Sequence, residues 1–310
     1  MPDLLVALML SIAVLIGWLG VIRLRHSVRH TSLTAAAAWA IWFQMTLTVT
    51  TIATLAKGRV PLGILDQLWY LTAVSALCPF VAVLGARRGR LLEWSVFIVL
   101  PLIVVLEWPA LAQWKPCWNG QRLELEAPAL IGYFLAWMMS LGSYLIMTRF
   151  TPAVTCWAYA WMSAIMSLNN SLTDAFAALS PIRPGNHIYV AIAMQIFFWF
   201  AMNWAANVRS RYDGWDRVWH DFRGWFGVVW ATRIMARINE IALREQWPWR
   251  LTHDGWEPTS HEQPQSGPPI DDPRIDHTVR WLLKPFVDPE WIDERLNAAL
   301  PPSETSRGHK

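Results

Sequence analysis

The sequence predicts an all-α membrane protein, a polytopic bundle of about seven transmembrane helices with a mostly helical cytoplasmic C-terminal tail. Three observations support this prediction. Of the 310 residues, 54% are hydrophobic and only 16% are charged, whereas about a quarter of the residues in a soluble domain are charged. The apolar residues form long runs that end near residue 208. The charges are also segregated, because residues 1–208 hold 12 Lys and Arg with 7 Asp and Glu, and residues 209–310 hold 14 and 16.

The membrane domain is expected over residues 1–208 and contains seven stretches long enough to cross a hydrocarbon core, which takes about twenty residues. They lie near residues 4–22, 33–56, 64–86, 93–113, 127–148, 152–179 and 187–208. The first stretch has the acidic Asp3 before it and arginines after it, the reverse of a secretory signal, so we expect an uncleaved span. Because the connections are short, successive helices should pack as antiparallel neighbours.

Basic residues in the loops predict the orientation of these spans, since they gather on the cytoplasmic side. With the N-terminus outside, the inner loops hold nine basic residues: Arg23, Arg25, Arg29, Arg87, Arg88, Arg90, Arg149, Arg209 and Arg211. The outer connections then hold five: Lys57, Arg59, Lys115, Arg122 and Arg183. We therefore expect the N-terminus outside and the C-terminus in the cytoplasm. The preference for Arg over Lys points towards a bacterial inner membrane.

Residues 209–256 form a Trp-rich amphipathic segment, in which apolar residues recur at three- and four-residue spacing from Trp215 to Gln246. Gly224 and Gly227 could divide it into two helices. The candidate contact residues of this segment are Trp215, Trp219, Phe222, Trp225, Phe226, Trp230, Arg217, Arg223, Arg233 and Arg237. Two interpretations remain open: the helix lies on the lipid of an anionic inner leaflet, or its apolar face packs on protein.

The end of the chain reads as a linker followed by two short helices. Residues 257–272 are rich in proline and polar residues, which is typical of a flexible linker. Asp272–Pro273 and Asp288–Pro289 each offer an N-cap followed by proline at the first helical position, which predicts helices near 273–284 and 289–299. Residues 273–310 thus form a short acidic helical segment, with a disordered end expected over 301–310.

Six polar residues within or beside the spans form the candidate site, because polar groups are costly in hydrocarbon. They are Glu107, Asn169, Asn170, Asp174, Gln195 and Asp66. A rise of about 1.5 Å per residue places them towards the outer side, which leaves two interpretations open. In the first, the six residues line an outward-facing polar cavity that binds a small molecule or an ion. In the alternative interpretation, the aspartates are solvated at the interface and the amides form hydrogen bonds between helices.

The sequence contains no Walker A, GxGxxG, GxSxG or HExxH stretch, and every lysine lies outside the spans, which excludes a retinal Schiff base. No histidine lies deep in a span, and the three cysteines form no metal or disulfide pattern, so we expect no cofactor and no metal. The net charge of +3 is too small to predict nucleic-acid binding. We expect a non-catalytic scaffold or assembly subunit whose tail binds a protein partner or membrane lipid. The alternative is a transporter or sensor that uses the polar cavity.

Overall fold

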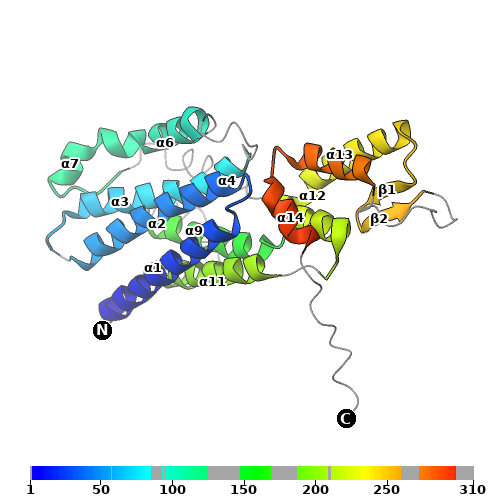
Figure 1. Ribbon diagram of the computed structural model, residues 1–310. Coiled ribbons are helices and arrows are strands. Elements are labelled where there is room, and N and C mark those ends of the chain that lie inside the picture. Colours follow the sequence, from blue (N-terminus) through cyan, green and yellow to red (C-terminus); the bar gives the residue numbers. More distant parts are fainter. Residues whose placement is uncertain are drawn as a thin grey trace, which may run out of the picture.

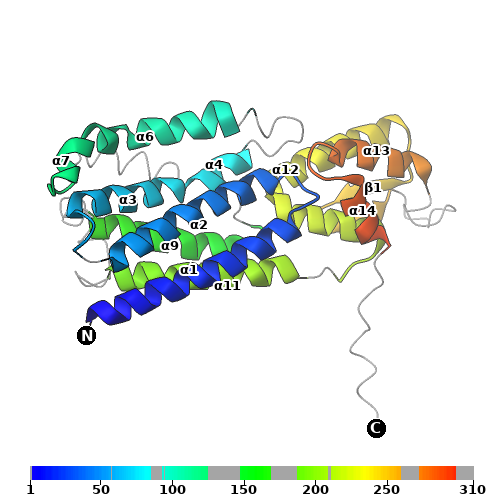
Figure 2. The same ribbon diagram turned by 60° about the vertical axis from the view of Figure 1, so that its left-hand side comes forward.

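The computed structural model describes residues 2–56, 58–84, 93, 95–124, 147–168, 187–208, 211–259 and 272–297. In these residues the chain is mostly helical and forms a helical bundle with a C-terminal domain at one end (Figure 1). We refer to residues 2–208 as the bundle and to residues 211–297 as the C-terminal domain. The start of α1 lies at the end of the bundle farthest from that domain (Figure 2).

The bundle consists, where it is described, of the following elements: α1 (Pro2–Ser27), α2 (Thr34–Leu55), α3 (Leu62–Ser75), α4 (Cys78–Leu84), the π-helical turn η1 (Ser95–Val99), α6 (Leu100–Ala112), α7 (Trp114–Trp118), α9 (Thr151–Leu168) and α11 (His187–Asn207). Among the described residues, four helical stretches are long and apolar enough to cross a membrane: Leu4–Ser27, Thr34–Leu55, Leu62–Val83 and Tyr189–Asn207. They coincide with four of the predicted spans.

The other three predicted spans are not confirmed, so the described residues support a membrane-embedded helical protein without fixing the number of spans at seven. The apolar helix near the predicted span 93–113 is shorter and covers Val96–Ala112. Nearly all of the predicted span 127–148 lies outside the described residues, as do residues 169–179 of the predicted span 152–179.

The helices α1, α2, α3, α9 and α11 form a closed ring in which each packs on the next. The short helix α6 packs on the outside of α3. Large apolar side chains are exposed around the bundle, among them Leu15, Leu19, Val105 and Phe200. A water-exposed surface of this kind would be unfavourable, whereas lipid chains would cover it. Close packing inside the ring requires small residues, because a Cβ atom on Gly20 would overlap the buried ring of Trp199.

The C-terminal domain is built around α12 (Gly214–Arg244), which bends at Gly227, where φ is 80°. The division of the predicted amphipathic segment at this glycine is therefore present. A hairpin of β1 (Trp249–Thr252) and β2 (Gly255–Pro258) follows, with Leu251 opposite Trp256 in the antiparallel register. This hairpin was not expected, and it includes the first two residues of the predicted linker. The remainder of that linker, 260–271, lies outside the described residues.

Two short helices, α13 (Pro273–Leu283) and α14 (Pro289–Leu296), complete the domain and agree with the helices predicted from the two Asp–Pro pairs. The Asp272 carboxylate accepts a hydrogen bond from the Arg274 N–H over 2.9 Å, which caps α13. Asp288 begins α14 without such a side-chain bond. The predicted disordered end, 301–310, lies outside the described residues.

The aromatic face of α12 forms the core of this domain. Its buried members are Trp215, Trp219, Phe222, Trp225 and Phe226, and Trp230 packs beside them against Phe286. The same core cluster includes bundle residues such as Val28, Leu33 and Phe150. Of the two interpretations of the segment, this burial agrees with packing on protein.

Candidate functional site

The described members of the predicted polar cavity lie in three different places. Asp66, on α3, binds Arg122 through two hydrogen bonds, with Nε–Oδ2 at 2.6 Å and Nη2–Oδ1 at 3.0 Å. The backbone N–H of Leu123 also donates to Asp66 over 3.3 Å. This aspartate therefore holds the loop that follows α7, and the ion pair accounts for its charge.

Glu107 lies on α6, where it is only 6% exposed. Hydrogen bonds from α3 to α6 lie on both sides of it along the chain: Tyr70 Oη donates to the Leu106 carbonyl and Gln67 Nε2 to the Ala110 carbonyl, each over 2.7 Å. One carboxyl oxygen of Glu107, Oε1, has no hydrogen-bond partner among the described residues. Glu107 is thus a buried acid in the interface between α3 and α6.

Gln195 lies on α11 and lines a cavity of about 70 Å³ inside the helix ring, which neither Asp66 nor Glu107 lines. The described residues therefore do not form the expected shared polar cavity. Asn169, Asn170 and Asp174 lie outside the described residues.

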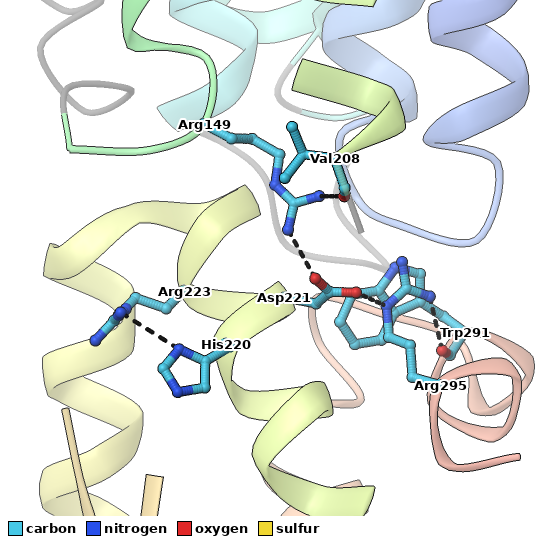
Figure 3. A network of polar contacts seen from close by, with 7 residues as sticks. All are labelled: Arg149, Val208, His220, Asp221, Arg223, Trp291 and Arg295. Carbon is cyan, nitrogen blue, oxygen red and sulfur yellow. Dashed lines mark hydrogen bonds and ion pairs between the residues drawn. The ribbon is translucent and has the colours of Figure 1, made fainter. Parts of the chain in front are cut away.

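A buried group of three charged residues joins the bundle to the C-terminal domain, and the sequence interpretation did not include it. Asp221 of α12 binds Arg149 on one side, with Oδ1–Nη2 at 2.7 Å, and Arg295 on the other, with Oδ2–Nε at 2.9 Å (Figure 3). The three side chains are between 9% and 15% exposed. We call this group the ion triad.

Further contacts fix each arginine of the ion triad. Arg149 precedes α9, and its Nη1 donates to the Val208 carbonyl at the end of α11 over 3.0 Å (Figure 3). Its backbone N–H donates to the Gly224 carbonyl, and a Cβ atom at Gly224 would lie 2.9 Å from Arg149 Nη2. Arg295 lies 3.6 Å from the ring centre of Trp291 and donates to the carbonyl of the same residue over 2.9 Å. Burial lowers the pKa of Arg295, although the charge of Asp221 acts in the opposite direction.

A second contact between the two parts is made mainly by backbone groups. The Ser32 N–H donates to the Phe286 carbonyl over 2.7 Å, and the Asp288 N–H donates to the His30 carbonyl over 2.9 Å. His30 Nδ1 also lies 3.5 Å from Asp288 Oδ2. Ligand atoms of His30, Asp288 and Glu290 are close enough to hold a metal ion, within 4.8 Å of one another. The backbone contacts already explain why the first two of these residues meet.

Two titratable side chains of α12, His220 and Asp216, bind the hairpin. His220 stacks on Tyr212 with ring centres 3.7 Å apart, and its Nε2 lies 3.1 Å from the Asp254 carbonyl. Burial lowers the pKa of His220. Asp216 Oδ1 accepts the Trp256 N–H over 2.8 Å, and burial raises the pKa of Asp216.

The four arginines predicted for membrane or partner contact also lie against their own domain or helix. Arg217 is buried, and Arg223 donates to the His253 carbonyl. The guanidinium of Arg233 lies 5.2 Å from the ring centre of Trp230, and Arg237 pairs with Glu240 over 2.5 Å. Arg217 therefore lies inside the domain, whereas Arg233 and Arg237 remain exposed on its surface.

The fold and the ion triad define a membrane-embedded helical bundle with a C-terminal domain docked on one end. No protein-family model, curated protein or solved structure matches the chain.

Proposed function

We propose that the protein is a non-catalytic membrane scaffold that holds its C-terminal domain in one orientation on the cytoplasmic side and presents it to a protein partner. The observation that carries the proposal is the buried ion triad, which lies between the bundle and the domain. Linked domains move relative to one another unless their interface is large and hydrophobic. Here the core of the domain continues into Val28, Leu33 and Phe150 of the bundle.

The roles of the polar groups in the C-terminal domain support a structural rather than a catalytic function. A general acid or base needs hydrogen-bonding capacity directed at a substrate. His220, Asp216 and Asp221 instead bind backbone groups or arginines of the protein itself. The imidazole and the two carboxylates that could act as general acid or base are therefore bound in contacts that join α12 to the hairpin, to Arg149 and to α14.

We assign the partner surface to exposed large or charged side chains of the domain. Trp281 of α13 is 60% exposed and Leu243 at the end of α12 is 84% exposed. Arg250 of β1 is also exposed. Tryptophan is enriched among the residues that dominate binding energy at protein interfaces, so Trp281 is the proposed centre of the contact.

A photo-crosslinking amino acid placed in turn at positions 243, 250 and 281 tests this surface in native membranes. We expect the strongest discrete protein adduct from position 281, the proposed centre of the contact, and weaker adducts from positions 243 and 250. Adducts with lipid alone would assign the domain to the inner leaflet instead. The absence of a protein adduct from all three positions, in a chain whose domain remains docked, would overturn the scaffold proposal.

We further infer seven spans with the N-terminus outside and the C-terminal domain in the cytoplasm, in a membrane of the bacterial inner type. The loops next to the domain carry Arg29 and Arg149, and the start of α1 lies at the opposite end of the bundle (Figure 2). Single cysteines at Arg25 and Arg59, in a chain lacking its own cysteines, test the orientation. A membrane-impermeant maleimide should label R59C in intact cells and R25C only after permeabilisation, and the reverse pattern would refute it.

A further inference from the structure

We propose that the ring of α1, α2, α3, α9 and α11 contains a binding site for a small apolar molecule that carries one carbonyl oxygen. The site is the cavity of about 70 Å³ lined by residues from all five helices of the ring. It is independent of the scaffold proposal, because it lies within the bundle and shares no lining residue with the ion triad.

The walls of this cavity are aromatic and already fixed in place. Trp157 and Trp161, both on α9, use their indole N–H groups to bind the carbonyls of Ala76 and Ala73, each over 3.1 Å. The ring of Phe43 packs edge-on against Trp157 with centroids 4.7 Å apart. Since these N–H groups are occupied, the indoles present apolar surface to the cavity, as the walls of preformed ligand sites commonly do.

Two amide or hydroxyl side chains line the cavity, and one of them, Gln195, has a donor without a partner among the described residues. The Thr72 hydroxyl lies 2.8 Å from both the Leu68 carbonyl and the Thr50 hydroxyl. Gln195 is 8% exposed, and its Nε2 has no hydrogen-bond partner among the described residues. A buried amide donor without an acceptor is unfavourable, so an acceptor in the cavity would satisfy it.

The balance of polar and apolar groups selects the kind of ligand. A buried water needs about two to four polar partners, whereas the unpartnered buried amide in this lining is the Gln195 donor alone among the described residues. An ion would need several charged or polar ligands, which the lining residues do not supply. A small apolar molecule with a single carbonyl matches both the aromatic walls and the Gln195 amide. The volume is about half of the ~150 Å³ of an apolar cavity that binds benzene, which favours a small ketone or the tip of a longer molecule.

The whole protein, labelled with ¹⁵N in its glutamine side chains and held in maltoside micelles, tests the site by NMR with 2-butanone as the probe. We expect a saturable downfield shift of the Gln195 side-chain amide protons. Xenon should occupy the same cavity without that shift. In Gln195→Leu, which removes the donor at similar volume, butanone affinity should fall about tenfold, the loss expected for one hydrogen bond, while xenon binding persists.

A second variant and a second medium make the result decisive. Ala160→Leu, which fills the cavity, should abolish both butanone and xenon binding, and helical circular dichroism shows whether each variant is folded. If the amide shift is present without butanone in phospholipid nanodiscs but not in micelles, a lipid ester carbonyl is the natural occupant. If butanone leaves the amide unshifted while xenon binds, or if the amide contacts water alone, the proposal is wrong.

Discussion

Replacing Asp221 by asparagine removes the only negative charge of the ion triad and leaves Arg149 and Arg295 facing each other across a neutral amide. The three side chains are at most 15% exposed, so water screens the two arginines poorly. Removing one partner of a buried ion pair typically costs about 3–5 kcal/mol, because an uncompensated charge stays buried. D221N should therefore weaken the attachment of the C-terminal domain by about this amount.

Native-state hydrogen exchange measures the effect where it occurs. About 3–5 kcal/mol corresponds to roughly two to four orders of magnitude in an equilibrium constant. Amide protection should fall by up to this factor in α14 and near Arg149, and much less in α1 and α2, away from the triad. The matched control is Glu240→Gln, also on α12, which breaks an exposed pair with Arg237 and should cost about 1 kcal/mol or less.

A charge-free replacement of the whole triad separates electrostatics from packing. Changing Arg149 and Arg295 to methionine together with Asp221→Leu removes all three charges at similar volume, and such replacements are often neutral or stabilising. We expect this triple variant to recover most of the protection that D221N loses. If D221N behaves like Glu240→Gln, or if the triple variant is as weak as D221N, the reasoning about buried charge is refuted.

Three further predictions concern single positions. Gly20→Ala should destabilise the bundle by about 1–3 kcal/mol in thermal unfolding, because the new Cβ overlaps Trp199, and no loss of stability would contradict this packing. The pKa of His220 is lowered by burial, so the unfolded chain binds its proton more readily, and stability should fall as the pH drops below about 6.5. Urea unfolding of His220→Gln should show a smaller decline over that range, and an unchanged decline would exclude His220 as its cause. Asp272→Ala should reduce the stability of α13 by about 1 kcal/mol, because the hydrogen bond from the Arg274 N–H to the N-cap is lost. Hydrogen exchange of the α13 amides measures this change, and unchanged protection would count against the cap.

Local patterns predicted those features that depend on neighbours in the sequence. The four long apolar helices follow from hydropathy, and α13 and α14 follow from Asp272–Pro273 and Asp288–Pro289. The sequence does not predict the hairpin, although Asp254–Gly255 is a recognised turn signal, because its two strands are only four residues each and are divided between the amphipathic segment and the linker.

The candidate site was harder to predict because its partners are distant in the chain. Asp221 lies 72 positions from Arg149 and 74 from Arg295, and each reads as an ordinary loop or helix charge. Asp66 was assigned to a cavity, whereas its partner Arg122 is 56 positions away in another loop. Neither periodicity nor span depth contains information on such pairs. The burial of Gln195 could be predicted from its apolar surroundings, but the aromatic walls around it could not.

The shared core between the bundle and the C-terminal domain has a consequence for biosynthesis. The domain includes Phe150 and Val28 in its core, and both belong to loops that reach their positions only when the flanking helices are inserted. A chain that fails to insert would leave Trp225 and its aromatic neighbours without these contacts, and exposed apolar surface marks a chain for chaperones and proteases. Complete folding of the C-terminal domain would thus depend on correct assembly of the bundle in the membrane.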